Sequence, residues 1–261
     1  MTTNPLRELA QYSYLILSFA RRDIRARYKQ TALGAAWAVL QPLSLMVIFT
    51  LVFDRVARIP TGGTPYPLFS YSALIFWSYF STTVSQGSLS MTANSNLVRK
   101  IYFPRETLLL AVMLSAGLDL AIACVMLGAL MVVYKATVTW TLLWVPVLLG
   151  VQVLFTFALI CLTSAVHVYF RDIGHALTLG LQLWMFATPV AYPLGVVPEN
   201  LLRLYMLNPM ATIIDGYRRA ILFGQTPDLA RLGVVLIFVV VLLGVTYLSF
   251  KQAERTFADV I

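Results

Sequence analysis

The chain has 261 residues, of which 59% are hydrophobic and 11% are charged, and its mean hydropathy is +0.80. A soluble domain carries about 25% charged residues, so this composition excludes an ordinary soluble globular protein. It also excludes a disordered chain, which needs low hydrophobicity and high charge. The net charge of +8 is typical of the cytoplasmic loops of a membrane protein and does not indicate a nucleic-acid partner. At about 20 residues per span, the length predicts an all-α integral membrane protein with roughly six transmembrane helices.

Residues 1–30 are predicted to be an N-terminal cytoplasmic segment that contains an amphipathic helix within residues 7–29. Polar side chains share one face of this helix and apolar side chains share the other, which is typical of a helix lying in the membrane interface. A plain solvated helix is the alternative. Four guanidinium groups within seven residues favour either an anionic ligand or anionic lipid, and they belong to Arg21, Arg22, Arg25 and Arg27.

Residues 31–261 are predicted to form a transmembrane domain. Apolar stretches place its six spans at about 33–54, 67–88, 107–133, 141–166, 175–193 and 231–250. If both termini are cytoplasmic, the cytoplasmic segments hold 12 of the 19 Lys and Arg residues and the opposite segments hold seven. The positive-inside rule therefore predicts that both termini lie in the cytoplasm.

The loop between the second and third predicted spans is predicted to contain a short helix within residues 94–103. Asn94 or Ser95 is able to cap it, and Pro104 ends it by disfavouring helix at the preceding residue. A short helix with basic and apolar residues suits a groove on a soluble partner. An ordinary basic cytoplasmic loop is the alternative. The candidate contact residues are Asn96, Leu97, Val98, Arg99, Lys100, Ile101, Tyr102 and Phe103.

Several predicted spans are rich in aromatic residues. Such residues face lipid or pack in the interior of most membrane proteins. Their rings also offer apolar surfaces to the CH face of a sugar, repeatedly along a polymer. The candidates for such a track are Phe76, Trp77, Tyr79, Phe80, Phe155, Trp184 and Phe186.

The segment between the last two predicted spans contains two short helical patterns within residues 200–223, joined at Asn208-Pro209. Irregular backbone at membrane depth is tolerated only inside protein or beside water, so a re-entrant pair that closes a pore is one interpretation. Two helices resting on the outer leaflet are the other. Asp215 precedes Arg218 and Arg219 by three and four residues, which predicts intrahelical ion pairs. The apolar residues expected to close the pore are Met206, Leu207, Met210, Ile213 and Ile214.

The sequence carries no motif for covalent chemistry. It has no phosphate-binding loop and no cluster of Cys and His, so we expect no catalytic residues, no metal and no cofactor on this chain. Asp119 is the one acidic residue well inside a predicted span. Such a residue is a functional candidate, and a buried structural hydrogen bond is an equally good interpretation.

Four segments carry a resemblance to a known family. They are RDIRARYKQTALGAAWAVLQP (22–42), NLVRKIYFPRE (96–106), YFRDIGH (169–175) followed by LWMFATPVAYP (183–193), and LNPM (207–210) followed by DGYR (215–218). Together they resemble the permease subunit of polysaccharide-exporting ABC transporters of the second type. This family includes Wzm-like O-antigen exporters, teichoic acid exporters and capsule exporters.

The resemblance implies a homodimer of six-span subunits with two copies of a separate ABC ATPase, which binds ATP and Mg. It implies an energy-coupling helix at 94–103 and re-entrant gate helices at 200–223. The implied substrate is a glycan on undecaprenyl diphosphate, whose diphosphate head is a candidate ligand for the four arginines. The implied location is the bacterial cytoplasmic (inner) membrane. The alternatives are an exporter of another substrate with the same fold, such as teichoic acid, capsule or a small molecule, and a membrane-embedded lipid-linked glycosyl or acyl transferase.

Overall fold

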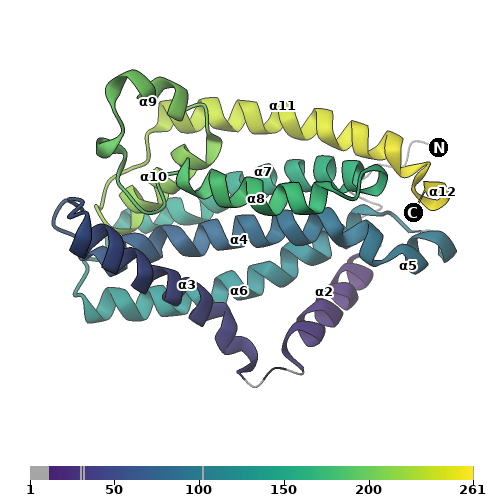
Figure 1. Cartoon of the computed structure of the whole chain (residues 1–261), viewed down its shortest axis with the longest axis horizontal. Helices are drawn as coiled ribbons and strands as arrows, with labels where there is room; N and C mark the ends of the chain where they lie inside the picture. Colours follow the sequence, from purple (N-terminus) through teal and green to yellow (C-terminus); the bar gives the residue numbers. More distant parts are fainter. Residues whose placement is uncertain (1–11, 30, 32, 102, 261) are drawn as a thin grey trace.

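The computed structural model describes residues 12–29, 31, 33–101 and 103–260. Within these ranges the chain forms helices and no strand. The long helices run along the longest axis of the molecule, and α2 is inclined to them (Figure 1). The N-terminal half contains α2 (Ser13–Tyr28), η1 (Gly34–Ala36), α3 (Trp37–Phe49), η2 (Thr50–Val56), α4 (Tyr66–Ala93), α5 (Ser95–Lys100) and α6 (Glu106–Val133). The C-terminal half contains η3 (Trp140–Leu143), α7 (Trp144–Tyr169), α8 (Ile173–Phe186), η4 (Leu194–Val196), α9 (Glu199–Tyr205), α10 (Pro209–Ile221), α11 (Leu229–Glu254) and α12 (Phe257–Val260).

Four helical segments in the described part of the chain are long and apolar enough to cross a membrane. They are Gly34–Val56, Glu106–Val133, Trp140–Tyr169 and Leu229–Glu254. Each coincides with a span expected from the sequence. The chain is therefore a multi-pass membrane protein, as its composition indicates.

The helix α4 coincides with the expected second span but is less apolar than these four. It lies at the centre of the molecule and packs against α6, α7 and α3. Most of its residues are buried, including Ser72 and Ser88, whose hydroxyls donate to carbonyls three residues earlier. These serines satisfy their own hydrogen bonds locally, so α4 tolerates them because its surroundings are protein rather than lipid.

The helix α8 is shorter than the predicted span at 175–193. It ends at Phe186, after 14 residues, and turns follow through Tyr192. Pro189 explains the early end, because proline lacks an N–H group and disfavours helix at the preceding residue. Fourteen helical residues cover about 21 Å, which is less than the hydrocarbon thickness of a bilayer.

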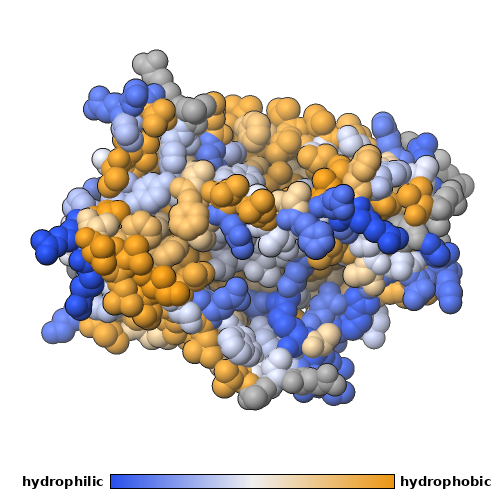
Figure 2. Space-filling view, viewed as in Figure 1, coloured by the Kyte–Doolittle hydropathy of each residue, from blue (hydrophilic) through white to orange (hydrophobic). Residues whose placement is uncertain are grey.

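The short helices gather at the two ends of the long ones. Figure 1 shows α5 and α12 at one end and α9 and α10 at the other, with α2 in the half nearer α5. Figure 2 shows hydrophobic surface over α11 and polar surface near α5 and α2. The apolar surface of α11 includes Val234, Ile237 and Leu248, each more than 60% exposed. Such a band of exposed apolar side chains is the surface that lipid or a second subunit covers.

Candidate functional site

The helix α2 packs against α6 and is not a free solvated helix. Ala20 is buried in this contact, whereas Arg21 and Arg25 point outward and are exposed. The ring of Phe19 lies 5.9 Å from the ring of Phe103, so α2 also contacts the chain that follows α5. The amphipathic pattern in the sequence therefore reflects a helix with one face on protein.

The four arginines of α2 do not form one cluster. Arg22 pairs with its neighbour Asp23 at 2.9 Å, at an exposed position. Arg27 points into the protein, whereas Arg21 and Arg25 are exposed and form no ion pair with another described residue. The sequence pattern alone did not separate these environments, because a run of arginines carries no information on which residues face the core.

Arg27 forms an ion pair with Asp119, the single acidic residue well inside a predicted span. The same guanidinium donates to Gln86 Oε1 at 2.7 Å and to Ser115 Oγ at 3.2 Å. The hydroxyl of Tyr28 donates to the second oxygen of Asp119. Burial, and then the hydrogen bond to Asp119, raises the pKa of Tyr28 to about 12, so the hydroxyl stays protonated and acts as the donor. This network ties α2 to α4 and α6.

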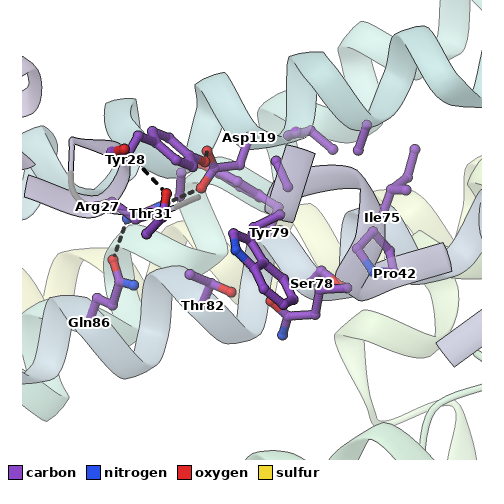
Figure 3. Close-up of a pocket in the computed structure, with 16 residues that line it drawn as sticks. Arg27, Tyr28, Thr31, Pro42, Ile75, Ser78, Tyr79, Thr82, Gln86 and Asp119 are labelled. Atoms are coloured by element: carbon purple, nitrogen blue, oxygen red, sulfur yellow. Dashed lines mark hydrogen bonds and ion pairs between the residues drawn. The ribbon is translucent and has the colours of Figure 1, made fainter. Parts of the chain in front are cut away.

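Beside the ion pair lies a cavity of about 320 Å³ between α2, α3, α4 and α6 (Figure 3). One face of α4 lines it with residues three and four apart, as expected for a helix side. The cavity is lined by Arg27, Tyr28, Thr31, Trp37, Ala38, Gln41, Pro42, Ile75, Ser78, Tyr79, Thr82, Gln86, Ala116, Asp119, Leu120 and Ala123. Its lining mixes aromatic rings, amides and hydroxyls, which is the composition of a site for a polar ligand.

The helix α5 lies within residues 94–103, where the sequence predicts a short helix, but it ends at Lys100. It begins after Asn94, but the Asn94 side chain donates back to the carbonyl of Ser90 at 2.8 Å instead of capping α5. The backbone is extended at Ile101, three residues before Pro104. Val98 and Phe103 are buried and anchor the segment, whereas Asn96, Arg99, Lys100 and Ile101 are exposed and Leu97 is half-buried. Tyr102 lies outside the described residues.

Four charged residues connect the start of α6 with the end of α11. Glu106 is buried and contacts Lys251 Nζ at 2.5 Å, and Lys251 also contacts Glu254 at 2.9 Å. Arg105 reaches Glu254 through its backbone N–H at 3.1 Å and its guanidinium at 3.6 Å. The same guanidinium donates to the carbonyl of Val98 in α5 at 3.5 Å. The sequence analysis missed this network, because its two halves are about 150 residues apart.

Five of the seven aromatic candidates are buried inside the protomer. Phe76 stacks on Tyr217 with ring centroids 3.6 Å apart, and Phe80 stacks on Phe155 at 5.7 Å. Trp184 is half-buried and meets Phe80 edge-on at 5.3 Å. Phe186 is 52% exposed. The rings of Phe76, Trp77, Phe80 and Phe155 therefore pack helices together. Tyr79 is also buried but lines the cavity, and exposed ring surface belongs to Trp184 and Phe186.

The two helices before the last span are present as α9 and α10. Asn208 caps α10 by accepting from the N–H of Met210 at 3.1 Å, and Pro209 occupies the first helical position. Met210, Ile213 and Ile214 are fully buried. Of the five residues expected to close a pore, only Leu207, at 75% exposure, and the half-buried Met206 offer apolar surface.

Arg218 lies buried beneath the turns that follow α8. Its guanidinium donates to the carbonyls of Pro189, of Val190 at 2.5 Å and of Tyr192 at 3.0 Å. It also lies 3.7 Å from the ring centroid of Phe69. Of the two ion pairs predicted for Asp215, only that with Arg219 forms, at 2.6 Å. Arg218 instead satisfies the carbonyls that the broken helix leaves free, as buried polar groups require.

Comparison with known proteins identifies the family to which the chain is related. Residues 14–223 match the ABC-2 type transporter family of membrane proteins. The chain belongs to this family. The matched region runs from the start of α2 through the end of α10, so it includes the cavity, α5 and the α9–α10 pair.

The chain is similar along nearly its whole length to proteins with assigned roles. It is 32% identical to the O-antigen export system permease protein RfbA of Myxococcus xanthus, over 98% of each chain. It is 27% identical to the protein of the same name from Klebsiella pneumoniae, over 95% of each chain. It is 21% identical to the polysialic acid transport protein KpsM of Escherichia coli, over 90% of this chain and 91% of that protein.

Proposed function

We propose that this protein is the transmembrane subunit of an ATP-driven exporter of lipid-linked polysaccharide, with an O-antigen-like glycan on undecaprenyl diphosphate as its substrate. The observation that carries the proposal is the near full-length similarity to O-antigen export permeases within the ABC-2 type family. The more distant similarity to a polysialic acid transport protein supports a polymer substrate. The subunit acts as a transport channel and performs no covalent chemistry.

The proposed layout has six spans, made of the four apolar segments together with α4 and the α8 region. An even number of spans keeps α2, α5 and α12 on one side of the membrane, in agreement with their shared half of the molecule in Figure 1. The excess of Lys and Arg assigns that side to the cytoplasm of a bacterial inner membrane. In this layout α9 and α10 enter the outer side without crossing.

We propose that two copies of a separate ABC ATPase bind ATP and Mg and dock on α5 in each subunit. The support is the geometry of α5, which is anchored by buried Val98 and Phe103 and presents Lys100 and Ile101 outward. The charged network of Arg105, Glu106, Lys251 and Glu254 offers a route for movement from α5 into α6 and α11. In this proposal, a displacement of α5 by the ATPase is transmitted to α6 and α11 through these contacts.

A homodimer is proposed because a polymer must thread a channel between subunits, and the exposed apolar surfaces of α3, α8 and α11 leave area for such a contact. On the cytoplasmic side, Arg21 and Arg25 are the arginines available to the diphosphate head of the carrier. On the outer side, Leu207 and Met206 are the gate residues that the burial of α10 leaves exposed.

Deletion of the gene in the native host tests the proposal. We expect carrier-linked glycan to accumulate inside the cell and to disappear from the surface, with both effects reversed by the wild-type gene. Complementation must fail when the ATPase partner carries a substitution that abolishes ATP hydrolysis. Unchanged surface glycan in the deletion strain contradicts the proposal. A missing sugar or acyl group on an otherwise exported glycan favours a membrane transferase instead.

A further inference from the structure

The cavity beside the Arg27–Asp119 pair supports an inference about the part of the substrate that this subunit recognises, and this inference rests on the proposed function. We propose that the cavity is a binding site for an uncharged sugar unit of the carrier-linked glycan. Its volume of about 320 Å³ lies at the lower end of the pockets that hold small ligands, about 300–1,000 Å³. The site is distinct from the exposed arginines Arg21 and Arg25.

The first argument is charge. Among the residues that the structure describes, Arg27 and Asp119 are the only Asp, Glu, Lys, Arg or His residues that line the cavity, and they neutralise each other. The Arg27 guanidinium is further engaged by Gln86 and Ser115, and the Asp119 carboxylate accepts from Tyr28. A diphosphate entering here would meet an arginine that is already satisfied and a carboxylate that repels it. An uncharged ligand does not need the Arg27 guanidinium as a partner and is not repelled by the Asp119 carboxylate.

The second argument is hydrogen bonding. Within the part of the chain that the structure describes, the side chains of Gln41, Ser78, Tyr79 and Thr82 make no hydrogen bond, although they line the cavity. Tyr79 is 6% exposed, so its hydroxyl has little access to water outside the cavity. Pro42 also has no N–H to donate to the carbonyl of Ala38, and both residues line the same space. Gln41 is exposed and Ser78 and Thr82 are half-buried, so their polar groups are open to a ligand or to water that donates and accepts hydrogen bonds.

The third argument is ring surface. Tyr28, Trp37 and Tyr79 come from three different helices and all line the cavity. Figure 3 shows Tyr28 and Tyr79 among the polar side chains of the site. A sugar ring has an apolar CH face and a rim of hydroxyl groups, which matches aromatic faces interleaved with amides and hydroxyls. A lipid chain that covered the cavity would bury these amides and hydroxyls without partners, and an unpaired polar group costs about 1–3 kcal/mol once it is buried.

The test is competition binding to the full-length subunit assembled with its ATPase partner in lipid nanodiscs. The probes are undecaprenyl diphosphate-linked oligosaccharide extracted from the host, undecaprenyl diphosphate alone, and the free oligosaccharide released by mild acid. We expect the sugar-bearing carrier to bind about tenfold more tightly than the bare carrier, and the free oligosaccharide to bind least. Tenfold corresponds to about two hydrogen bonds of ordinary net strength.

Substitutions in the cavity decide where this preference arises. Trp37→Leu and Gln41→Leu should each weaken binding of the sugar-bearing carrier by about 2- to 10-fold and leave the bare carrier unchanged. Trp140→Leu is the matched control, because Trp140 is 67% exposed and lies outside the cavity, in η3. Recovery of the assembled complex by size-exclusion chromatography checks folding of every variant.

Equal binding of the sugar-bearing and bare carriers overturns the inference and leaves the proposed function intact. The same holds if Trp37→Leu and Gln41→Leu weaken binding of both carriers by the same factor. Failure of both carriers to bind the wild-type complex overturns the proposed function, and this inference with it.

Discussion

At the residue scale, the buried Arg218 and the part-buried Arg27 show two different structural roles of arginine. Arg218 donates to three carbonyls in the turns that follow α8. Arg27 joins α2 to α4 and α6. Both contacts join segments far apart in the chain, and neither was evident from the local pattern. The sequence left open whether Asp119 is a functional or a structural residue, and its contacts fit both roles, since it pairs with Arg27 and also lines a cavity.

The pair of Arg27 and Asp119 should stabilise the subunit. We expect Asp119→Asn to lower the free energy of unfolding by about 1–3 kcal/mol, because the substitution leaves a part-buried guanidinium without its counter-charge. Thermal unfolding of the purified subunit in detergent measures this loss. The double variant with Arg27→Gln should recover part of it. Arg22→Gln is the control, because the exposed Arg22–Asp23 pair contributes about 1 kcal/mol or less. Equal losses for Asp119→Asn and Arg22→Gln would contradict a structural role for the inner pair.

At the element scale, the packing of α4 on α7 depends on one close approach. A Cβ atom at Gly87 would lie 2.8 Å from Ile160 Cγ2 and 3.1 Å from its Cβ, so the helices meet at this glycine. We expect Gly87→Ala to destabilise the subunit by about 1–3 kcal/mol through overpacking. Gly150→Ala in α7 is the matched control, because its Cβ meets nothing within 4 Å and alanine favours helix by up to about 1 kcal/mol. A stabilised Gly87→Ala variant would show that α4 and α7 separate easily.

The helix α5 is the element expected to couple the ATPase to transport. Arg99→Glu combined with Lys100→Glu should abolish glycan export while the subunit still folds in the membrane, because both side chains lie on the exposed surface. Surface glycan and co-purification of the ATPase are the two measurements. Arg55→Glu is the control for charge reversal, since Arg55 is exposed in η2. Normal export and normal ATPase association in the double variant would show that α5 does not couple the ATPase to transport.

At the scale of the whole molecule, the proposed homodimer places α9 and α10 at the outer end of a channel. The residue Leu207, 75% exposed in the turn before α10, should face its counterpart in the idle state. In a background with Cys124→Ala and Cys161→Ala, Leu207→Cys should cross-link two subunits and the bond should block export. Ile213→Cys should not cross-link, because Ile213 is fully buried within one subunit. If Leu207→Cys reacts only with lipid-soluble reagents, the segment is a surface anchor.

The sequence by itself determined the class of the protein and most of its elements. Composition predicted a helical membrane protein, and long apolar runs located four membrane-spanning segments, because lipid imposes length and hydrophobicity on each helix separately. The local signal at Asn208-Pro209 located the start of α10, since caps and prolines act within a few residues. The signals around 94–104 predicted a short helix there, but α5 forms without a cap from Asn94 and ends at Lys100.

Only the tertiary structure decided which side chains are free to act. It buried Met210, Ile213 and most of the aromatic candidates, paired Arg27 with Asp119, and joined α6 to α11 through Glu106 and Lys251. It also showed that α4 is central and that α8 ends early. The physical reason is that burial and charge pairing depend on contacts between helices far apart in sequence, whereas hydrophobic periodicity reports only that a face is covered and not what covers it.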